Sequence, residues 1–179
     1  MKNAIKEIFS MSVYLLVILG LTYLVITYVG QRTEVSGASM ENTLYDNDQL
    51  IVDKISYRFK DPQRFDIIVF PFQYQEDVFY IKRIIGMPGE TVQIDESGVV
   101  WINGEILEES YGKEVIKSAG RAATEITLGD DEYFVLGDNR NNSSDSRDPS
   151  VGNIKRDQII GRAWVRILPI NKAGILKHQ

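Results

Sequence analysis

The sequence predicts a mostly β domain preceded by one transmembrane α-helix. A long uncharged and largely apolar run occupies residues 10–30, and after it the chain alternates short β-rich runs with turn signals. At a rise of about 1.5 Å per residue, the run is long enough to cross a hydrocarbon core of roughly 30 Å. We therefore expect a short cytoplasmic N-terminus over 1–9, an anchor over 10–30 and an extracytoplasmic domain over 31–179.

The charges around the apolar run predict its orientation. Lys2 and Lys6 precede the run and only Glu7 opposes them, so the basic excess favours a cytoplasmic N-terminus and a single-pass protein of the cell membrane. A core helix and a cleavable signal peptide ending at the small residues 36–38 are the alternatives. A core helix of this length is expected to show a polar stripe, and an h-region usually has only about 7 to 15 apolar residues. An uncleaved anchor is the favoured interpretation.

The remainder of the chain has the pattern of an all-β domain. The predicted strands are 49–55, 66–70, 78–85, 91–94, 99–102, 132–136 and 162–168. Asn103-Gly104 suits a tight turn that needs positive φ angles, so a hairpin is expected around 99–102. The segment 105–123 is charged and irregular, which predicts a surface excursion between strands.

Composition excludes several classes of function. A chain of 179 residues is long enough for one ordinary domain. The net charge of -5 provides no basic face for phosphates, so nucleic acid is not an expected partner. Cysteine is absent, and the single histidine, His178, is the penultimate residue, where chain ends usually fray. A Ser-His-Asp triad, a Cys-His pair or a histidine-rich zinc site is therefore excluded, and a hydrolase would need Lys, Asp or Glu as its base.

Three segments contain candidate catalytic residues. Ser39 follows Gly37 and Ala38, where the backbone can bend, although a serine in this context is usually a turn residue. Lys82 and Arg83 interrupt the apolar run 78–85, so one of them must face inward if the run is a strand. Burial lowers a lysine pKa toward about 7 to 8, which suits a general base, whereas arginine stays charged. A snorkelling or ion-paired lysine on an edge strand is the alternative.

The third segment, 137–147, mixes opposite charges with short polar side chains. Its charged residues are Asp138, Arg140, Asp145 and Arg147, set among asparagines and serines. Such a segment can be a solvated surface loop. It can also be a rigid loop that holds a neighbouring group, because charged pairs and short side chains satisfy backbone groups locally. The β-rich entry over 132–136 favours the ordered loop.

In this order, behind an N-terminal anchor, the three segments resemble the bacterial type I signal peptidases, over nearly the whole chain. Ser39-Met40 followed by Thr43-Leu44 is similar to the nucleophile box of that family. The general-base box is matched by Tyr80-Ile81-Lys82-Arg83 with Gly86, Pro88, Gly89 and Glu90, and the signature loop by 137–147. The single anchor and the compact size are more similar to the Gram-positive type than to the two-anchor Gram-negative type.

The resemblance implies a fold, an activity and residue roles. It implies the mostly β signal-peptidase fold and a Ser-Lys dyad in which Ser39 is the nucleophile and Lys82 the base. By the same analogy Ser143 hydrogen-bonds and orients Lys82, while Asp138, Arg140, Asp145 and Arg147 form a scaffold around them. The implied substrates are secretory preproteins with small residues at the first and third positions before the cut. No metal or cofactor is expected.

The chain departs from the family pattern at three places. Asn42 stands where the nucleophile box usually has proline, which puts the rigidity of that turn in question. Gly37 stands where some relatives have a serine that donates to the oxyanion, so backbone N–H groups, including that of Ser39, would form the hole. After Arg147 the segment 148–152 replaces the usual aromatic residue and glycine, so the loop exit is expected to differ.

Two further functions and one membrane contact remain open from the sequence. A self-cleaving Ser-Lys regulator would share the chemistry, but the anchor and the lack of a DNA-binding segment disfavour it. An inactive membrane-tethered binding paralogue is the other alternative. Phe70, Phe72 and Tyr74, around Pro71, are candidates for insertion into the lipid interface, with ordinary core or loop packing as an equal alternative.

Overall fold

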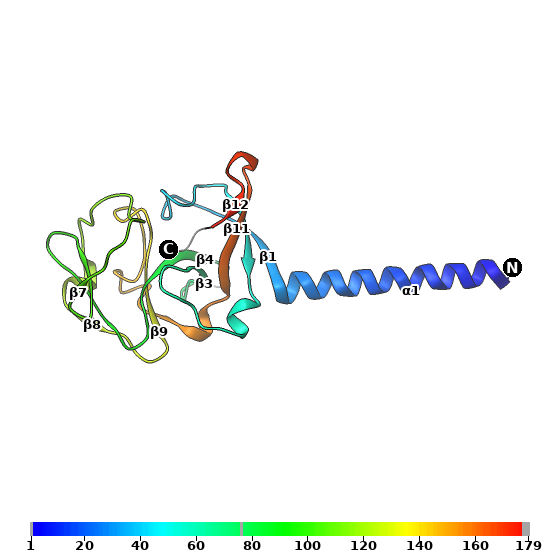
Figure 1. The fold of residues 1–179 in the computed structure, drawn as a ribbon, viewed down its shortest axis with the longest axis horizontal. Helices are drawn as coiled ribbons and strands as arrows, with labels where there is room; N and C mark the ends of the chain where they lie inside the picture. Colours follow the sequence, from blue (N-terminus) through cyan, green and yellow to red (C-terminus); the bar gives the residue numbers. More distant parts are fainter. Residues whose placement is uncertain (1, 76, 177–179) are drawn as a thin grey trace.

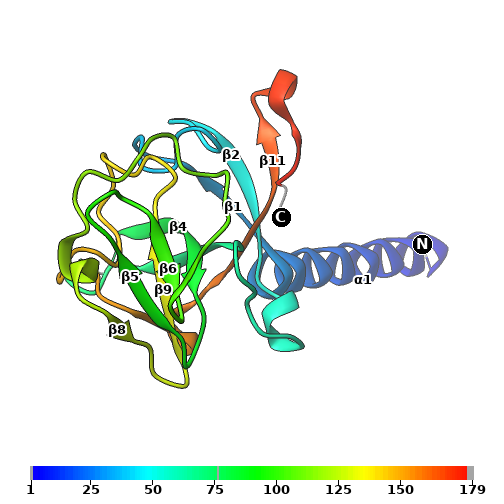
Figure 2. The same cartoon turned by 60° about the vertical axis from the view of Figure 1, so that its left-hand side comes forward.

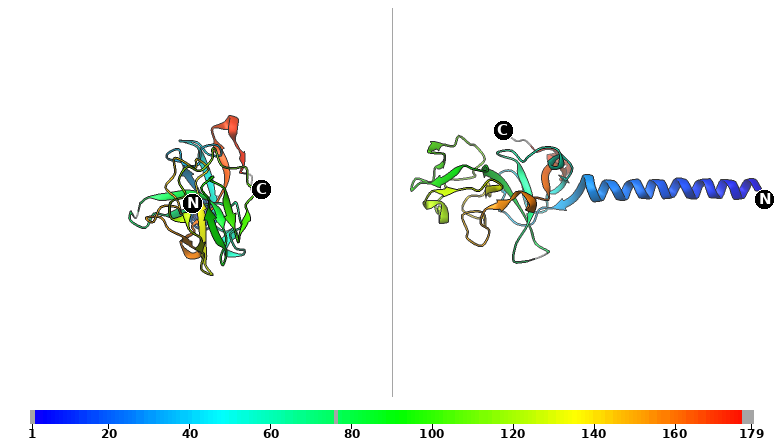
Figure 3. Two further views of the ribbon diagram at one scale, coloured as in Figure 1. Left: turned by 90° about the vertical axis from the view of Figure 1, so that its left-hand side faces the viewer. Right: turned by 90° about the horizontal axis from the view of Figure 1, so that it is seen from below.

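A single long helix leads into a β domain in the computed structural model, which describes residues 2–75 and 77–176. Helix α1 spans Lys2–Leu24, continues as a π-helical turn η1 over Val25–Val29, and passes directly into strand β1 at Gly30. Figure 1 and the right-hand view of Figure 3 show α1 projecting from the domain as a separate rod. The apolar span Lys6–Val29 buries none of its most hydrophobic stretch within the protein, so it is not a core helix.

The larger sheet carries the functional segments. Its strands run in the order β1-β2-β11-β3-β4-β9-β10, with β12 paired to β11, and all pairings are antiparallel. The strands are β1 Gly30–Glu34, β2 Gln49–Asp53, β3 Ile67–Pro71, β4 Phe79–Gly86, β9 Glu132–Leu136, β10 Ile154–Lys155, β11 Gly161–Leu168 and β12 Gly174–Ile175. Short 3-10 turns η2 Ser56–Arg58, η4 Arg156–Gln158 and η5 Ile170–Lys172 connect them.

A smaller sheet lies at the far end of the domain from α1 (Figures 1 and 2). Its order is β7-β6-β5-β8, from β5 Thr91–Ile94, β6 Val100–Ile102, β7 Glu105–Ile106 and β8 Ile126–Thr127. Asn103 and Gly104 have φ angles of 53° and 78° and connect β6 to β7 by a tight turn. The predicted hairpin is therefore confirmed, because asparagine and glycine tolerate the left-handed backbone that this turn requires.

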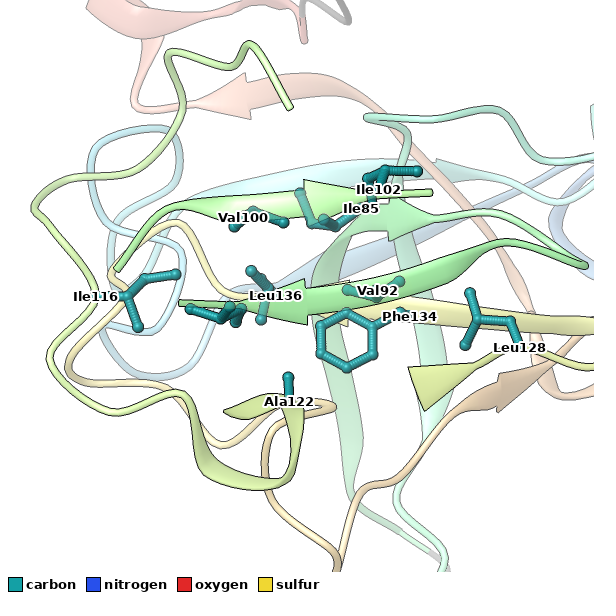
Figure 4. Close-up of a cluster of buried hydrophobic side chains, with 10 residues drawn as sticks. Ile85, Val92, Val100, Ile102, Ile116, Ala122, Leu128, Phe134 and Leu136 are labelled. Atoms are coloured by element: carbon teal, nitrogen blue, oxygen red, sulfur yellow. The ribbon is translucent and has the colours of Figure 1, made fainter. Parts of the chain in front are cut away.

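The main apolar core lies between the two sheets (Figure 4). It joins β5 and β6 of the smaller sheet to β4 and β9 of the larger one, through side chains such as Val92, Phe134 and Leu136 that are fully buried. At Gly86 a Cβ atom would lie 2.6 Å from a methyl carbon of Val92, so only glycine allows this close approach of the sheets. Two further clusters pack against the remaining faces of the larger sheet.

The predicted strands are all present, with ends shifted by at most two residues. Strands β1, β7, β8, β10 and β12 were not predicted, and all except β1 contain only two residues. The segment 105–123 is more than a surface excursion, because it begins with β7, ends with the 3-10 turn η3 Gly120–Ala123, and buries Ile116 and Ala122 in the core. Isolated apolar residues in a charged stretch give no period, so sequence pattern alone does not reveal them.

Candidate active site

Ser39 lies in a tight turn that two buried side chains hold against the larger sheet. Met40 and Leu44 are almost completely buried in the cluster beneath β2 and β11. Within the turn, Glu41 N–H donates to Ala38 C=O at 3.1 Å and Leu44 N–H donates to Met40 C=O at 2.8 Å. Ser39 itself is half-buried. The apolar anchors therefore fix the turn while the serine side chain stays accessible.

Lys82 brings its amine to the Ser39 hydroxyl. It lies on β4 opposite Ile68 of β3, and its side chain is inward with only 4% of the residue exposed. The Nζ atom is 2.8 Å from Ser39 Oγ, and it also donates to the carbonyl oxygen of Ile81 at 3.0 Å. The Tyr80 ring covers it, with its centroid 4.9 Å from Nζ. Two residues 43 positions apart in the chain are thus joined by a direct hydrogen bond.

The surroundings of Lys82 bring the pKa of its amine close to physiological pH. Burial lowers the pKa of Lys82 from 10.5 to about 8, because an ammonium ion loses its hydration in this position. The carboxylates of Asp145 and Asp138 act in the opposite direction and raise the same pKa. Desolvation is the larger effect, so the amine is a feasible proton acceptor for Ser39 Oγ.

Arg83 is buried as completely as Lys82, but its partners are a carboxylate and an aromatic ring. The sequence required only one inward cation, yet both are buried, because β4 packs against apolar clusters on both faces. Arg83 binds Asp138 through two hydrogen bonds, Nε to Oδ1 at 2.9 Å and Nη2 to Oδ2 at 2.7 Å. The Tyr111 ring stacks on its guanidinium at 3.6 Å. Arg83 thus ties β4 to the first acidic residue of the loop after β9.

The loop 137–147 is rigid, as its polar composition predicted. Arg147 binds both carboxylate oxygens of Asp145, each at 2.8 Å, and Asp145 accepts the Gly137 N–H at 3.0 Å. Arg140 binds both carboxylate oxygens of Glu109, at 2.5 and 2.7 Å. These charged pairs are almost fully buried. Bidentate pairs of this kind fix direction as well as distance, so the loop keeps its shape beside Lys82.

Ser143 does not make the hydrogen bond to Lys82 that the resemblance implies. Among the residues that the structure describes, Lys82 Nζ bonds only Ser39 and Ile81, and Ser143 Oγ is buried without a hydrogen-bond partner. Its hydroxyl instead lies against the α-carbon of Gly137, where a Cβ atom would be only 2.2 Å from Ser143 Oγ. The residue is therefore adjacent to the site, but its hydroxyl is not directed at the amine.

Several residues that the sequence did not single out hold the site together. Asn139 donates its backbone N–H to the Ser39 carbonyl and its side-chain amide to the Ala38 carbonyl, both at 3.0 Å. Thr43 lies between the buried pair, hydrogen-bonded to both Asp138 and Arg83. Asn139 and Thr43 lie inside the segments that match the family boxes, and this position was the sequence feature that could have indicated their roles. No pattern in the irregular segment indicated that it supplies Tyr111.

The segment 109–113 forms a strap across the nucleophile turn and the loop after β9. Besides the ion pair of Glu109 and the ring of Tyr111, the Lys113 N–H donates to Asp138 C=O at 2.8 Å. The Lys113 ammonium binds Glu41 at 2.7 Å, and the Asn42 amide donates to Tyr111 C=O at 3.4 Å. This strap therefore joins the two segments that position Ser39.

Asn42 adopts a backbone conformation that proline cannot adopt. Its φ angle is 95°, whereas the proline ring fixes φ near −65°. The turn is nevertheless ordered by its own hydrogen bonds, including Thr43 N–H to Met40 C=O at 3.0 Å. With Asn42 in place of proline, the turn after Ser39 therefore has a different conformation but is still ordered. The loop exit is likewise ordered, since Val151 and Gly152 N–H groups both donate to Asp148 C=O at 3.0 Å.

A cleft of about 450 Å³ ends at the Ser39–Lys82 pair. One wall is formed by residues 33–36, at the end of β1 and just beyond it, and the other by residues 77–82 on and before β4. β1 is the terminal strand of its sheet, and β4 pairs with β9 only from Arg83 onward. Both walls consequently present strand edges without a neighbouring strand in the part of the chain that the structure describes.

The Ser39 N–H is also available at the end of this cleft. Among residues 2–75 and 77–176 it donates to no protein acceptor, whereas the Gly37 N–H donates to Asp46 Oδ1 at 2.7 Å. Gly37 has a φ angle of 90°, and a Cβ atom there would contact nothing within 4 Å. The backbone N–H of Ser39 is therefore the donor that this geometry offers to an oxyanion.

The three aromatic residues considered for lipid contact, Phe70, Phe72 and Tyr74, differ in their exposure. Phe70 is 1% exposed and belongs to the core beside β4, so of the two alternatives left open by the sequence it has core packing and not lipid contact. Phe72 is half-buried and stacks on Tyr80 with ring centroids 4.8 Å apart, whereas Tyr74 is exposed. The alternation of strand side chains sends Phe70 inward.

Within the described residues, no group of three or more His, Asp or Glu side chains is arranged for a metal ion.

Comparisons with known proteins identify the family. A family model described as "Signal peptidase, peptidase S26" matches residues 7–168. A probable signal peptidase I-2 of Synechocystis sp. is 41% identical over 156 residues, covering 84% of this chain and 68% of the relative. Signal peptidase I P of Bacillus subtilis subsp. natto is 34% identical over 166 residues, 88% of each chain. A signal peptidase I of Enterococcus faecalis V583 is 36% identical, with a TM-score of 0.47 over 57% of this chain and 97% of that one. The chain belongs to the signal peptidase family, the S26 serine peptidases that cleave signal peptides.

Proposed function

We propose that Ser39 and Lys82 are the catalytic dyad of this serine endopeptidase. The observation that carries the proposal is the 2.8 Å contact between Ser39 Oγ and a buried Lys82 amine whose pKa is lowered to about 8. Such an amine is neutral in a useful fraction of molecules near pH 7, and the only histidine, His178, is the penultimate residue of the chain. Both requirements for an activated serine, proximity and a neutral base, are met by one residue.

The geometry supports an acyl-enzyme mechanism. Ser39 Oγ attacks the scissile carbonyl carbon while neutral Lys82 takes the hydroxyl proton, and the carbonyl oxygen becomes an oxyanion beside the Ser39 N–H. Lys82 then gives that proton to the leaving amine nitrogen as the C–N bond breaks. Water attacks the resulting ester while Lys82 accepts a proton from that water. Lys82 then gives the proton to Ser39 Oγ as the ester C–O bond breaks. Besides the substrate, these steps use one water molecule.

The roles of the surrounding residues follow from their contacts. Asp138 fixes β4 through Arg83, Asp145 fixes the loop through Arg147, and Arg140 fixes the strap through Glu109. These are positioning roles, since none of the six side chains hydrogen-bonds Ser39 Oγ or Lys82 Nζ among the described contacts. For Ser143, a residue of this loop whose buried hydroxyl has no partner among the described residues, we propose only that the hydroxyl can turn toward the amine when substrate binds.

The substrates we propose are translocated preproteins whose cleavage site lies extended in the cleft. The unpaired edges of β1 and β4 support main-chain pairing with such a segment. Small residues at the first and third positions before the cut are proposed for the part of the cleft beside Ser39, which residues 33–36 and 77–82 also line. Ser39 follows the last residue of the span, Val29, by ten positions, so it lies at most about 35 Å from the membrane surface. This short separation supports a dyad that reaches a cleavage site emerging from the bilayer.

We also propose that the N-terminal span crosses the cell membrane with Lys2 and Lys6 on the cytoplasmic side. The helix is long and apolar enough to span a bilayer, and its most hydrophobic stretch is not buried against the domain. Protease added outside cells whose outer envelope is permeable but whose cell membrane is intact should then digest the chain beyond Arg32. Complete protection of that region would reverse the proposed orientation.

Incubation of the purified protein in detergent with a model preprotein tests the catalytic proposal. N-terminal sequencing should identify a cut after a small residue. The Ser39→Ala variant should fold and remain membrane-bound but produce no cut, because it loses only one oxygen atom. Processing by Ser39→Ala near the rate of the parent would eliminate Ser39 as the nucleophile. A parent protein that cuts itself but no separate preprotein would instead indicate a self-cleaving regulator.

A further inference from the structure

A basic and aromatic turn of the β domain is attached directly to the domain end of the membrane span. The segment Lys54 to Lys60 contains η2 and connects β2 toward β3. Its Lys54 N–H donates to the carbonyl oxygen of Val29, the last residue of the span, at 3.0 Å. The Arg58 guanidinium lies 5.4 Å from the centre of the Tyr28 ring. Figures 1 and 2 both show this turquoise turn beside the domain end of α1.

These contacts fix the height of the turn relative to the bilayer. The span Lys6–Val29 contains 24 residues and is therefore about 36 Å long, somewhat longer than a hydrocarbon core of about 30 Å. Its last two residues consequently lie in the headgroup layer, where tyrosine is enriched. Because Lys54 and Arg58 contact those residues, the whole turn lies in that layer when the helix crosses the membrane.

The exposed side chains of the turn are of the aromatic and basic types that suit an anionic lipid surface. Phe59 is 83% exposed, the largest exposed fraction of the large apolar side chains that the structure describes. Arg58 and Lys60 beside it are exposed, and Lys54 is half-buried. The segment contains no acidic residue. The acids at its two ends do not oppose it equally: Asp53 is buried and caps η2, whereas Asp61 is exposed and lies 3.4 Å from Arg156.

We propose that residues 54–60 form a second membrane contact, in which Phe59 inserts among the acyl chains and Arg58, Lys60 and Lys54 bind anionic lipid headgroups. Each cation near such a surface adds favourable electrostatic energy, and burial of a phenylalanine ring adds an apolar contribution. The first contact, the helix, limits the distance of the domain from the membrane. The second restrains its rotation about the helix, and so holds the cleft at a constant height above the bilayer. The inference rests on the proposed membrane insertion of the helix.

Site-directed spin labelling tests this contact directly, because the chain contains no cysteine. Single variants Phe59→Cys, Ile106→Cys and Val17→Cys are labelled in vesicles with and without anionic lipid. Ile106 is the matched control: it is apolar, 57% exposed and located on β7 at the far end of the domain from α1 (Figure 1). Accessibility to oxygen and to a water-soluble nickel complex gives the depth of each label.

The three labels separate the possible outcomes. A label at 17 in the hydrocarbon, a label at 59 at the level of the headgroups or deeper, and a label at 106 in water support the proposal. If the label at 17 is deep but the label at 59 is as water-accessible as that at 106, the second contact does not exist. A label at 17 in water shows that helix insertion itself fails, which overturns the proposal together with the membrane topology.

An activity measurement checks the consequence for catalysis. Phe59→Ser should lower kcat/KM for a membrane-inserted preprotein in anionic vesicles by about tenfold, the population effect expected from losing one buried aromatic ring. The same variant should cut a short soluble peptide in detergent at the parental rate, which also shows that it is folded. The control Ile106→Ser should leave both rates unchanged. An equal loss on both substrates would overturn the membrane role of Phe59.

Discussion

The buried Lys82 amine should set the acid limb of the rate profile. Burial lowers its pKa to about 8, although Asp145 and Asp138 act to raise it. Only the neutral amine accepts the Ser39 proton, so activity follows the neutral fraction. As pH rises through this pKa the active fraction increases, and above it the rate becomes constant. Activity should therefore decrease as the pH is lowered.

The size of the effect follows from the two pKa values. With a pKa of about 8, roughly a tenth of the molecules carry a neutral amine at pH 7. With the ordinary value of 10.5, only about three in ten thousand would do so. Burial of this one side chain therefore increases the population of active enzyme at pH 7 by about 300-fold. Below pH 7, kcat/KM should fall by about tenfold per pH unit.

Hydrolysis of a short peptide in detergent, measured from pH 6 to 10, gives the profile without membrane effects. Lys82→Arg is the decisive variant, because arginine keeps the charge but offers no neutral base in this range. It should be as inactive as Lys82→Ala. Substantial activity of Lys82→Arg, or a parental profile that still rises steeply at pH 10, would refute the assignment of Lys82 as a general base with a lowered pKa.

The same pKa difference predicts a cost in stability. Since the folded-state pKa is below the unfolded value, the unfolded chain binds more protons between these values, and stability rises with pH there. Below pH 8 the full cost is present, about 3 kcal/mol at roughly 1.4 kcal/mol per unit. Lys82→Met, of similar length and apolar, should therefore unfold at higher denaturant concentration than the parent at pH 7. This advantage should disappear as the pH approaches 10.5.

Two further predictions concern the nucleophile turn. Asn42→Pro, which restores the family residue, should lower the free energy of unfolding by more than about 1 kcal/mol, because a φ angle of 95° is closed to proline. Asn42→Gly should stay within about 1 kcal/mol of the parent in the same denaturation assay, and equal stability of all three would contradict this account of the turn. Tyr111→Leu removes the ring that stacks on Arg83, so the rate of Ser39 acylation by a serine-reactive inhibitor should fall, whereas Tyr111→Phe should retain it. An unchanged acylation rate in Tyr111→Leu would show that the strap does not position the serine.

Sequence reasoning reached the proposed dyad because its members lie in short, dense motifs. Ser39 was marked by neighbouring small residues and the matched box, and Lys82 by a charge inside an apolar strand. The direct contact between them depends on the pairing of β3 with β4 and on the burial of Met40, which no local pattern specifies. The strands were predictable from alternation and turn residues for the same reason that the motifs were: each is a property of a few consecutive residues.

The failures all involve contacts between distant segments. Tyr111 reaches Arg83 from a segment without periodicity, so its role had no local signal. Phe70 was a candidate for lipid contact, with core packing as an equal alternative, and the strand register turns it into the core. The hydrogen bond from Ser143 to Lys82 was implied by analogy, whereas in the structure the Ser143 hydroxyl lies buried against Gly137 without a partner.

The buried arginines explain how a lysine can lose its charge in a site that contains two carboxylates. Asp138 is bound by Arg83 and Asp145 by Arg147, each through two hydrogen bonds, and no carboxylate forms a salt bridge with Lys82 among the described residues. Were either carboxylate unpaired, it would attract the ammonium ion and raise the lysine pKa further. Buried ion pairs are weak contributors to stability, since desolvation offsets much of their attraction. Their value here is electrostatic: they commit each carboxylate to an arginine, so desolvation can keep Lys82 a base.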